Sequence, residues 1–563
     1  MPKSPSDKNR AGPITAARLN FPLPPIQNLP QRREFKYTSR RHRNNRYRTR
    51  QNLTNILFVA SEAHPLIKPG GLGDVAGSLP VALQSLRADV RLLLPAYRDA
   101  VARAGRLKTI ATLTVPGLGA PVRILEGRLP GTPLIAWLVD FPPAYDRPGS
   151  PYLDSLGQAW PDNAMRFALL AHVAVLLALG RTRLKWRPDV VHCHDWQTGL
   201  VPALLAPEKN RPATVFTIHN LAYQGLFPYE TFTALGLPAS LWSHDALEFH
   251  DQLSFIKGGL VFADRLTTVS PTYAREIQTP ESGSGLDGLL RRRAGRLTGI
   301  LNGIDGEEWN PARDPFIAKP YSARRLQDKL PNKLALQQEF GLLREPQTTL
   351  IGMVGRLVQQ KGIDLVLETL PGLMHRPLQL VILGSGEAGY EVALRAQVAR
   401  YPGRLAVQIG YDERLAHMIE AGADMFLMPS RFEPCGLNQL YSLRYGTIPI
   451  VRHVGGLADT VVDTTAENLK AGKATGVVLE EARAGALLAA VDRALVLRQN
   501  TRRWKQMMHT GMRHDFTWRR SAAEYLRLYK QAAQANRQHQ DNEPNRKNAH
   551  VPGKRGKRTG PKH

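Results

Sequence analysis

Short apolar runs alternate with amphipathic stretches along this chain, and the whole alternation occurs twice. The first series is NILFVA, VRLLLP, LIAWLVD, DVVHCHD, TVFTIHN, RLTTVS and LTGILNG, and the second is TLIGMVGRL, LQLVILGSG, RLAVQIGYD, ADMFLMPS and TIPIVRHVGG. Runs of this length between helical patterns predict parallel strands covered by helices. The fold class is therefore α/β, with two Rossmann-like, doubly wound domains that face each other across a deep cleft.

A charged, irregular stretch rich in Pro at residues 310–331 separates the two series. We place the first domain at residues 54–312 and the second at residues 313–511. In open parallel sheets, ligands bind beyond the carboxyl ends of the strands. Polar motifs that directly follow an apolar run are therefore the first candidates for a functional site.

The two ends of the chain differ from its body in composition. The formal net charge is +27, and residues 1–52 hold 13 lysines and arginines against two acidic residues, while residues 533–563 hold eight against two. This composition predicts disorder at residues 1–53 and 533–563. We expect the tails to attract polyanions nonspecifically, and no dedicated nucleic-acid site in the body. A targeting role, such as a plastid transit peptide, or a nucleic-acid role of the tails stays open.

Further counts limit the class of protein. Only Cys193 and Cys435 are present, which excludes a disulfide scaffold and a cysteine-rich metal site and fits a reducing compartment. The longest apolar helix candidate, residues 168–179, contains His172 and is too short to cross a membrane. No apolar signal region opens the chain. We expect a cytoplasmic protein with no membrane partner.

The segment KPGGLGDV follows the first apolar run closely. A strand, a glycine turn and an amphipathic helix in that order let backbone amides and a helix N-terminus face an anion. Lys68 adds a cation, Gly71 and Gly73 supply bare backbone, and Asp74 follows at once. The glycine spacing does not match the dinucleotide fingerprint, so a tight turn that binds nothing is the alternative.

A second strand-to-helix junction, GMVGRLVQQKG, carries Arg356 and Lys361. A planar guanidinium fork beside a mobile ammonium suits the paired oxygens of a diphosphate. Solvated surface cations are the alternative interpretation.

The segment MPSRFEPCG places Glu433 directly before Pro434 and Cys435 at another strand end. A carboxylate fixed in this way can hold sugar hydroxyls or face a developing positive charge. The alternative is an acidic residue that only stabilises a helix N-terminus. We expect Cys435 to pack, because no base accompanies it as a nucleophile would need.

Two strands end in histidines. His192, His194 and Asp195 raise the question of a metal, but no further ligand cluster completes a coordination shell, so we predict no metal site. His219, after the next strand, is able to donate a hydrogen bond to a sugar hydroxyl or to be a satisfied structural histidine.

Together, eleven stretches resemble the bacterial and plastid glycogen and starch synthases, retaining glucosyltransferases of the GT-B fold that use ADP-glucose. In chain order they are KPGGLGDV, YDRPGSPY, WPDNAMRFALL, HCHDWQTGL, TIHNLAYQG, FIKGGLVFADRLTTVSPTYAREI, GLDGLLRRR, LNGIDGEEWNP, GRLVQQKG, EPCGLNQLYSLRYGTIPIVRHVGGLADTV and DFTWRRSAAEYLRLY. They cover nearly all of the chain between its two basic tails. Pro69, Ser282 and Val477 depart from the residues common in the family.

The resemblance implies roles for individual residues. Lys68 is similar to the family's donor-binding lysine, and Arg356 and Lys361 to the pair that neutralises the leaving diphosphate. Glu433 is similar to the carboxylate that faces the glucose. The other implied site residues are Gly71 and Gly73 on the phosphate, Asp74 near the glucose, His219 and Asp195 in catalysis, Asn302 in the cleft, Tyr411 against adenine, and Cys435, Gly436 and Leu437 lining the same site.

The activity implied is transfer of glucose from ADP-glucose to the nonreducing end of an α-1,4-glucan such as glycogen, with retention of configuration and without a cofactor. The first domain would bind the glucan, the second would bind the donor, and a helix at residues 512–532 would pack back on the first domain. The alternatives are a catalytically idle glucan-binding protein, a phosphorylase and a UDP-sugar transferase.

Overall fold

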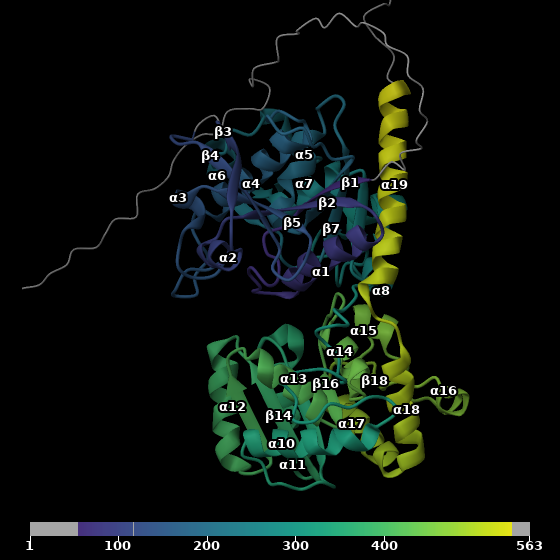
Figure 1. Ribbon diagram of the computed structural model, residues 1–563. Coiled ribbons are helices and arrows are strands. Elements are labelled where there is room, and N and C mark those ends of the chain that lie inside the picture. The colour runs from purple at the N-terminus through teal and green to yellow at the C-terminus, as the bar shows by residue number, and fades with distance from the viewer. Residues whose placement is uncertain (1–53, 116–117, 543–563) are drawn as a thin grey trace, which may run out of the picture.

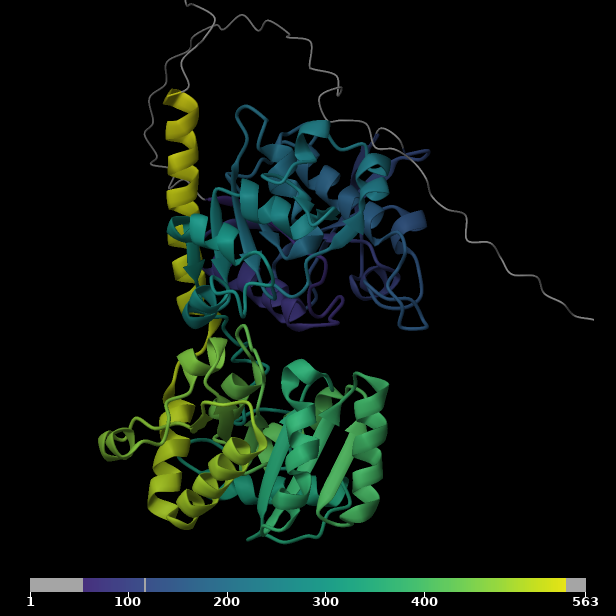
Figure 2. The same cartoon turned by 180° about the vertical axis from the view of Figure 1, so that it is seen from behind.

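The computed structural model describes residues 54–115 and 118–542, and in it the chain forms two α/β domains. The first domain lies above the second in Figure 1, and the long helix α19 (Trp518–Asn542) runs along the side of the first. The reverse view in Figure 2 shows the same arrangement from behind. The predicted two-domain α/β architecture is confirmed, while residues 1–53 and 543–563 lie outside the described part.

The first domain is built on a nine-stranded sheet of order β12-β11-β7-β6-β1-β2-β5-β4-β3. β1 lies in the middle and pairs in parallel with β2 and β6. Its apolar run is buried on both faces, as expected for a strand covered by helices on each side. The strands are β1 (Asn55–Val59), β2 (Asp89–Pro95), β3 (Lys108–Leu113), β4 (Val122–Arg128), β5 (Ile135–Asp140), β6 (Val190–His194), β7 (Ala213–Ile218), β11 (Arg265–Thr268) and β12 (Leu297–Gly299).

One edge of this sheet departs from the predicted parallel pattern. The sequence runs account for all strands of the sheet except β3 and β4, and β4 pairs antiparallel with both β3 and β5. β3 is mostly exposed, and exposed residues interrupt the apolar pattern of β4. Such half-solvated strands lack the continuous apolar run that reveals a buried parallel strand.

The second domain has a six-stranded, all-parallel sheet of order β15-β14-β13-β16-β17-β18. Its strands are β13 (Thr349–Val354), β14 (Leu378–Gly384), β15 (Leu405–Ile409), β16 (Met425–Met428), β17 (Ile448–Arg452) and β18 (Val477–Leu479). Five of them match the predicted runs, and only the short β18 is missed. A small antiparallel sheet, formed by β8 (Leu226–Pro228), β9 (Glu248–Phe249) and β10 (Gln252–Ser254), lies in the first domain.

Helices cover the faces of both large sheets (Figure 1). Those of the first domain are α1 (Gly71–Ser85), α2 (Arg98–Arg103), α3 (Pro142–Tyr145), α4 (Asn163–Ala178), α5 (Leu200–Leu205), α6 (Tyr229–Ala234), α7 (Phe255–Phe262), α8 (Pro271–Glu276) and α9 (Asp287–Arg292). Those of the second are α10 (Leu330–Glu339), α11 (Ile363–Met374), α12 (Ala388–Arg400), α13 (Glu413–Gly422), α14 (Asn438–Arg444), α15 (Gly455–Thr460), α16 (Ala466–Ala471), α17 (Ala484–Gln499) and α18 (Thr501–Arg513).

The chain enters the core of the second domain earlier than the predicted boundary at residue 312. Ile304 and Trp309 are both buried in the second core. The Trp309 ring is stacked between His417, with centroids 3.8 Å apart, and Tyr441, with centroids 3.7 Å apart. This aromatic stack fixes the linker to the second domain, so the boundary falls between β12 and Ile304.

Helix α19 returns to the first domain, as the resemblance implies. Ala522, Tyr525, Tyr529 and Ala532, which share one helical face, are buried in the first core. The helix does not end at residue 532, however, but continues to Asn542. The predicted disorder from residue 533 is therefore wrong as far as residue 542, because the α19 face continues to pack at Ala533 and Asn536. None of the described helices is long and apolar enough to cross a membrane.

Candidate active site

The glycine loop holds Lys68 and Asp74 side by side at the start of α1. The Nζ of Lys68 lies 2.7 Å from Oδ1 of Asp74. A Cβ on Gly73 would lie 3.2 Å from both Lys68 and Oε2 of Glu62, which leaves little room for a side chain. Burial lowers the pKa of Lys68, but the Asp74 carboxylate outweighs burial, so this pKa lies above its ordinary value. The loop therefore presents a positioned ammonium group.

Glu62 binds the backbone of the same loop. The sequence analysis did not identify this residue. Its Oε2 accepts a hydrogen bond from the Gly70 amide at 3.0 Å, and its Oε1 accepts one from the Tyr152 hydroxyl at 2.7 Å. Burial raises the pKa of Glu62 to about 7. The signal in the sequence was an acidic residue three positions beyond the end of a largely buried strand.

The loop lies near two residues of the second domain, Leu437 and Tyr411. A Cβ on Gly71 would lie 4.0 Å from Cδ1 of Leu437. The charges of Lys68 and Asp74 both act on Tyr411, which lies just before α13. Tyr411 is 63% exposed, so its ring is open to a stacking partner. Five predicted donor-site residues, Lys68, Gly71, Asp74, Tyr411 and Leu437, are thus brought together from both domains.

Lys361 and Glu433 form an ion pair in the second domain. The Nζ of Lys361 lies 2.5 Å from Oε2 of Glu433, and this oxygen also accepts a hydrogen bond from the Ser430 hydroxyl at 3.0 Å. The Glu433 side chain is only 7% exposed. At Gly362 the backbone φ is +74°, and a Cβ would lie 2.4 Å from the carbonyl oxygen of Pro429. The close approach at Gly362 holds the loop that carries Lys361 against the end of β16.

Arg356 reaches from the end of β13 to the first domain. Its Nη1 donates a hydrogen bond to the Tyr223 hydroxyl at 2.6 Å, and its Nη2 donates to Oε1 of Gln360 at 3.1 Å. The guanidinium carbon lies 5.7 Å from the centroid of the Tyr223 ring. These contacts are exposed, so a bound anion can replace them at little cost. Tyr223 was missed in the sequence analysis, although it lies four residues after His219.

The segment that follows Glu433 is fixed by close backbone contacts. A Cβ on Gly455, where φ is +43°, would lie 1.9 Å from the Glu433 carbonyl oxygen. The Gly455 amide also donates a hydrogen bond to Oε1 of Glu276 in the first domain at 2.8 Å. Gly436 has a φ of +72°, a conformation that few other residues adopt. The backbone here is therefore fixed by Gly436, which the sequence analysis singled out, and by Gly455 and Glu276, which it did not.

Cys435 and Asn302 meet at the junction of the two domains. The Asn302 backbone amide donates a hydrogen bond to the Cys435 thiol, and burial raises the pKa of this thiol to about 12. A protonated, buried thiol agrees with the predicted packing role. The Asn302 side-chain oxygen is buried and has no hydrogen-bond partner among the described residues.

Asp195 and His219 lie together in the first domain. Oδ1 of Asp195 accepts hydrogen bonds from the backbone amides of His219 at 2.7 Å and of Asn220 at 3.4 Å. Burial raises the pKa of Asp195 to about 7 and lowers the pKa of His219 to about 3. Asp195 therefore shapes the loop after β7, and His219 is a neutral imidazole at neutral pH.

Of the histidines that raised the question of a metal, His192 has both ring nitrogens in other contacts, and His194 contacts His219 through Nδ1. Nε2 of His192 lies 2.6 Å from the Thr217 hydroxyl, and its Nδ1 lies 2.7 Å from the Tyr529 hydroxyl. Within residues 54–115 and 118–542, one group of three potential ligands, His64, Glu308 and Glu413, has its ligand atoms within 4.8 Å of one another. Burial, together with a hydrogen bond to Glu413, raises the pKa of Glu308 to about 8.

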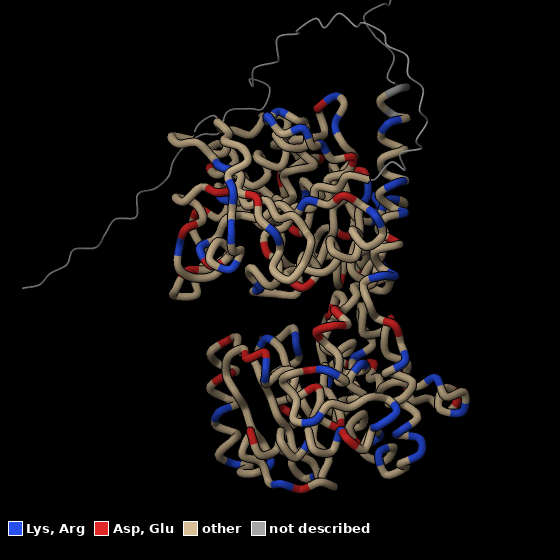
Figure 3. Tube along the Cα trace, viewed as in Figure 1, with Lys and Arg blue, Asp and Glu red and all other residues tan. Residues whose placement is uncertain are grey.

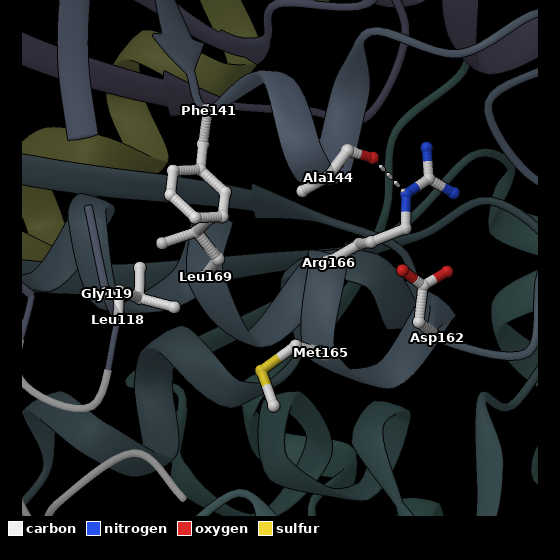
Figure 4. A pocket seen from close by; sticks show the side chains of 8 residues that line it. All are labelled: Leu118, Gly119, Phe141, Ala144, Asp162, Met165, Arg166 and Leu169. Atoms are coloured by element: carbon white, nitrogen blue, oxygen red, sulfur yellow. Dashed lines mark hydrogen bonds between the residues drawn. The ribbon is translucent and has the colours of Figure 1, made fainter. Parts of the chain in front are cut away.

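In the described part of the chain, neither the surface charges nor the cavity beside Arg166 coincides with the predicted site. In the view of Figure 3, acidic and basic residues are interspersed along both domains, without a single basic stripe. Figure 4 shows a small cavity in the first domain beside the buried Arg166, whose Nε donates a hydrogen bond to the Ala144 carbonyl at 2.8 Å. Its lining residues, Leu118, Gly119, Phe141, Ala144, Asp162, Met165, Arg166 and Leu169, include none of the predicted site residues.

Known proteins resemble both halves of this chain. Residues 55–292 match the family described as starch synthase catalytic domain, and residues 337–508 match glycosyl transferases group 1. Glycogen synthase 1 of Methylococcus capsulatus is 58% identical over 85% of this chain and 96% of its own length. Glycogen synthase 2 of Nitrosococcus oceani is 55% identical over 84% and 97%.

A solved structure gives the same result. The catalytic domain of starch synthase IV from Arabidopsis thaliana, bound to ADP and acarbose, superimposes with a TM-score of 0.77 at 32% identity, covering 86% of this chain and 99% of that one. The level and extent of these similarities exceed what a shared fold alone would give. The chain therefore belongs to the family of bacterial and plant glycogen and starch synthases, which have the GT-B fold.

Proposed function

We propose that the protein transfers glucose from ADP-glucose to the nonreducing 4-hydroxyl of an α-1,4-glucan, with retention at the anomeric carbon. The observation that carries this proposal is the Lys361–Glu433 ion pair at the carboxyl edge of the second sheet, in the domain that the Lys68 loop faces. A nucleotide-sugar donor needs a cation beside its diphosphate and a carboxylate beside its sugar, and this pair supplies both. The names of the relatives, and the ADP and acarbose bound to starch synthase IV, support the same donor and acceptor classes.

The cations act on the leaving group. When the bond between the anomeric carbon and the diphosphate oxygen breaks, negative charge grows on the ADP. Lys68, Arg356 and Lys361 stabilise this charge, with the glycine-loop amides beside them. Arg356 and Lys361 exchange Tyr223 and Glu433 for phosphate oxygens as the donor binds.

Glu433 acts on the sugar, where positive charge grows on the ring as the bond lengthens. Its largely buried carboxylate faces that charge in surroundings from which water is mostly removed. The acceptor 4-hydroxyl forms the new bond from the face that ADP leaves, and its proton passes to a departing phosphate oxygen. Since protein cations neutralise the diphosphate, we expect turnover without a divalent ion.

The purified full-length chain, with glycogen as acceptor, is given ADP-glucose or UDP-glucose in parallel, with and without chelator. We expect α-linked glucose in the glucan and release of ADP, with ADP-glucose strongly preferred and no loss under chelation. Transfer only from UDP-glucose would overturn the donor assignment. Phosphate-dependent release of glucose 1-phosphate would indicate a phosphorylase, and glycogen binding without ADP release would indicate an idle glucan-binding protein.

The compartment is a further part of the proposal. The curated relatives come from bacteria, and among the described residues no helix is fit to cross a membrane. We propose the cytoplasm, with the plastid as the alternative. Fractionation of the source cells, with antibody detection of the full chain, tests this.

A further inference from the structure

His219 is held from behind by a second buried histidine. Nδ1 of His194, at the end of β6, lies 2.9 Å from Nε2 of His219. The His194 ring is fully buried and stacks on Phe58 at a centroid distance of 4.1 Å. Among the described residues His219 has no other side-chain hydrogen bond, so its Nδ1 is the ring atom left for a ligand.

Both rings are neutral in this contact at neutral pH. Burial lowers the pKa of His219 to about 3 and places that of His194 well below its ordinary value. One of the two nitrogens that meet therefore carries the proton and the other accepts it. Two arrangements satisfy the 2.9 Å distance, and they give His219 opposite properties.

The other nitrogen of His194 decides between the two arrangements. Nε2 of His194 is buried without a partner among the described residues. If His194 donates through Nδ1, its Nε2 is a bare lone pair; if His194 accepts, its Nε2 is a bare N–H. Orphaned buried N–H groups are rarer than under-satisfied acceptors. The neighbouring His192 cannot accept a hydrogen bond from an Nε2–H of His194, because both ring nitrogens of His192 already contact Thr217 and Tyr529.

We propose that His194 is a positioning residue, which donates its Nδ1–H to Nε2 of His219 and thereby fixes His219 as the Nδ1–H tautomer. His219 then offers a neutral hydrogen-bond donor to a hydroxyl of the transferred sugar. This inference rests on the proposed function, and it specifies the polarity of the sugar site. A neutral donor orients the sugar without placing a positive charge beside the sugar ring, which itself becomes positively charged during transfer.

Three variants separate this role from packing. His194→Phe keeps a buried ring and removes the donor, whereas His194→Asn places an amide N–H near the position of Nδ1–H. His172→Phe is the matched control, because His172 is a buried histidine on α4 whose Nε2 also lacks a partner in the described part of the chain. The donor contact matters most when the sugar is distorted, so its loss lowers kcat more than it raises KM.

The first readout is the ¹⁵N spectrum of the full-length, ¹⁵N-histidine-labelled protein. We expect His219 to be protonated at Nδ1 in the wild type and in His194→Asn, and to lose that preference in His194→Phe. Protonation of wild-type His219 at Nε2 overturns the proposal. This result does not depend on turnover, so it stands apart from any failure of the proposed function.

The second readout is steady-state kinetics with the donor and glycogen. We expect kcat to fall about tenfold to a hundredfold in His194→Phe, with KM for the donor changed less than about threefold, and to recover at least in part in His194→Asn. His172→Phe is expected to keep the wild-type kcat. An unchanged kcat in a folded His194→Phe, or an equal loss in His172→Phe, contradicts the positioning role.

Discussion

The two domains contribute different mixtures of charged and neutral groups to the candidate site. The second domain offers full charges, with Lys361 and Glu433 in contact at 2.5 Å and Arg356 in exposed contacts with Tyr223 and Gln360. The first domain adds, beside the Lys68 loop, buried groups that burial keeps neutral, His194 and His219. The difference matches the two ends of a breaking glycosyl phosphate bond. The diphosphate needs cations, whereas a sugar that becomes positive is best held by neutral dipoles and a carboxylate.

Among the variants proposed for the site, removal of Lys361 is expected to lower activity most. In Lys361→Ala the diphosphate loses a cation, and Glu433 loses its partner in a nearly buried position. We expect kcat to fall on the order of 10³-fold, with a smaller change in the KM of the acceptor. Initial rates of ADP release measure this.

Arg376→Ala serves as the control for loss of an ion pair as such. Arg376 pairs with Asp492 at 2.5 Å in the same domain, away from the predicted site residues. Its kcat is expected to match the wild type. Near-normal turnover in Lys361→Ala would refute the assignment of Lys361 to the leaving group.

Arg356→Ala is expected to have the next largest effect. The guanidinium is exposed and makes replaceable contacts, so its removal leaves no buried charge unpaired. We expect a loss in kcat on the order of 10²-fold, because one stabilising group for the leaving phosphate is gone. Arg356→Lys is expected to recover only part of the rate, since an ammonium lacks the bidentate fork. Full activity of Arg356→Lys would show that a point charge is sufficient.

The fold was predictable for those elements whose burial is evident from a continuous apolar run in the sequence. β1 and β13 are buried apolar runs, and the sequence predicts both. β3 is largely exposed, so its pattern resembles a loop, and the polar end of α19 resembles a tail although it continues a packed helix. Edge strands and polar helix ends depend on neighbours that are distant in the sequence.

The site was predictable to the same extent. Lys68, Arg356, Lys361 and Glu433 follow strand ends within short motifs. The structure pairs Lys68 with Asp74 and Lys361 with Glu433. Arg356 instead contacts Tyr223 and Gln360, neither of which was predicted. Glu62, Tyr223 and His194 act through partners that lie between 8 and 133 positions away. Their residue types carry no local signal of that pairing, so only the folded chain reveals it.

Stability of the first domain should depend on pH through Asp195. Burial raises the pKa of Asp195 from its ordinary value of 3.8 to about 7. A raised pKa means that the folded state binds a proton that the unfolded state releases, so this contribution is complete below about pH 4 and is lost as pH rises through about 7. Asp195→Asn stays neutral, so its free energy of unfolding relative to wild type should rise by about 1–4 kcal/mol between pH 4 and pH 8.

Denaturant unfolding of both proteins across this pH range measures the difference. Asp146→Asn is the control, because Asp146 is exposed and pairs with Arg98 on the surface. Its difference from wild type should stay constant. A constant difference for Asp195→Asn as well would mean that its carboxyl group is ionised in the folded protein.

Tyr223→Phe should give the smallest effect and the sharpest test of how Arg356 is held before the donor binds. The variant keeps the aromatic ring, whose centroid lies 5.7 Å from the guanidinium carbon of Arg356. It removes only the hydroxyl that accepts the 2.6 Å hydrogen bond from Arg356. If this contact holds Arg356 only until phosphate replaces it, its loss frees Arg356 for the diphosphate. We expect a donor KM lowered by about twofold to threefold and an unchanged kcat, because an exposed hydrogen bond contributes well under 1 kcal/mol. A fall in kcat would instead mean that the Tyr223 hydroxyl contacts the reacting sugar or phosphate, and the same measurement in Arg356→Ala/Tyr223→Phe decides whether it acts through Arg356.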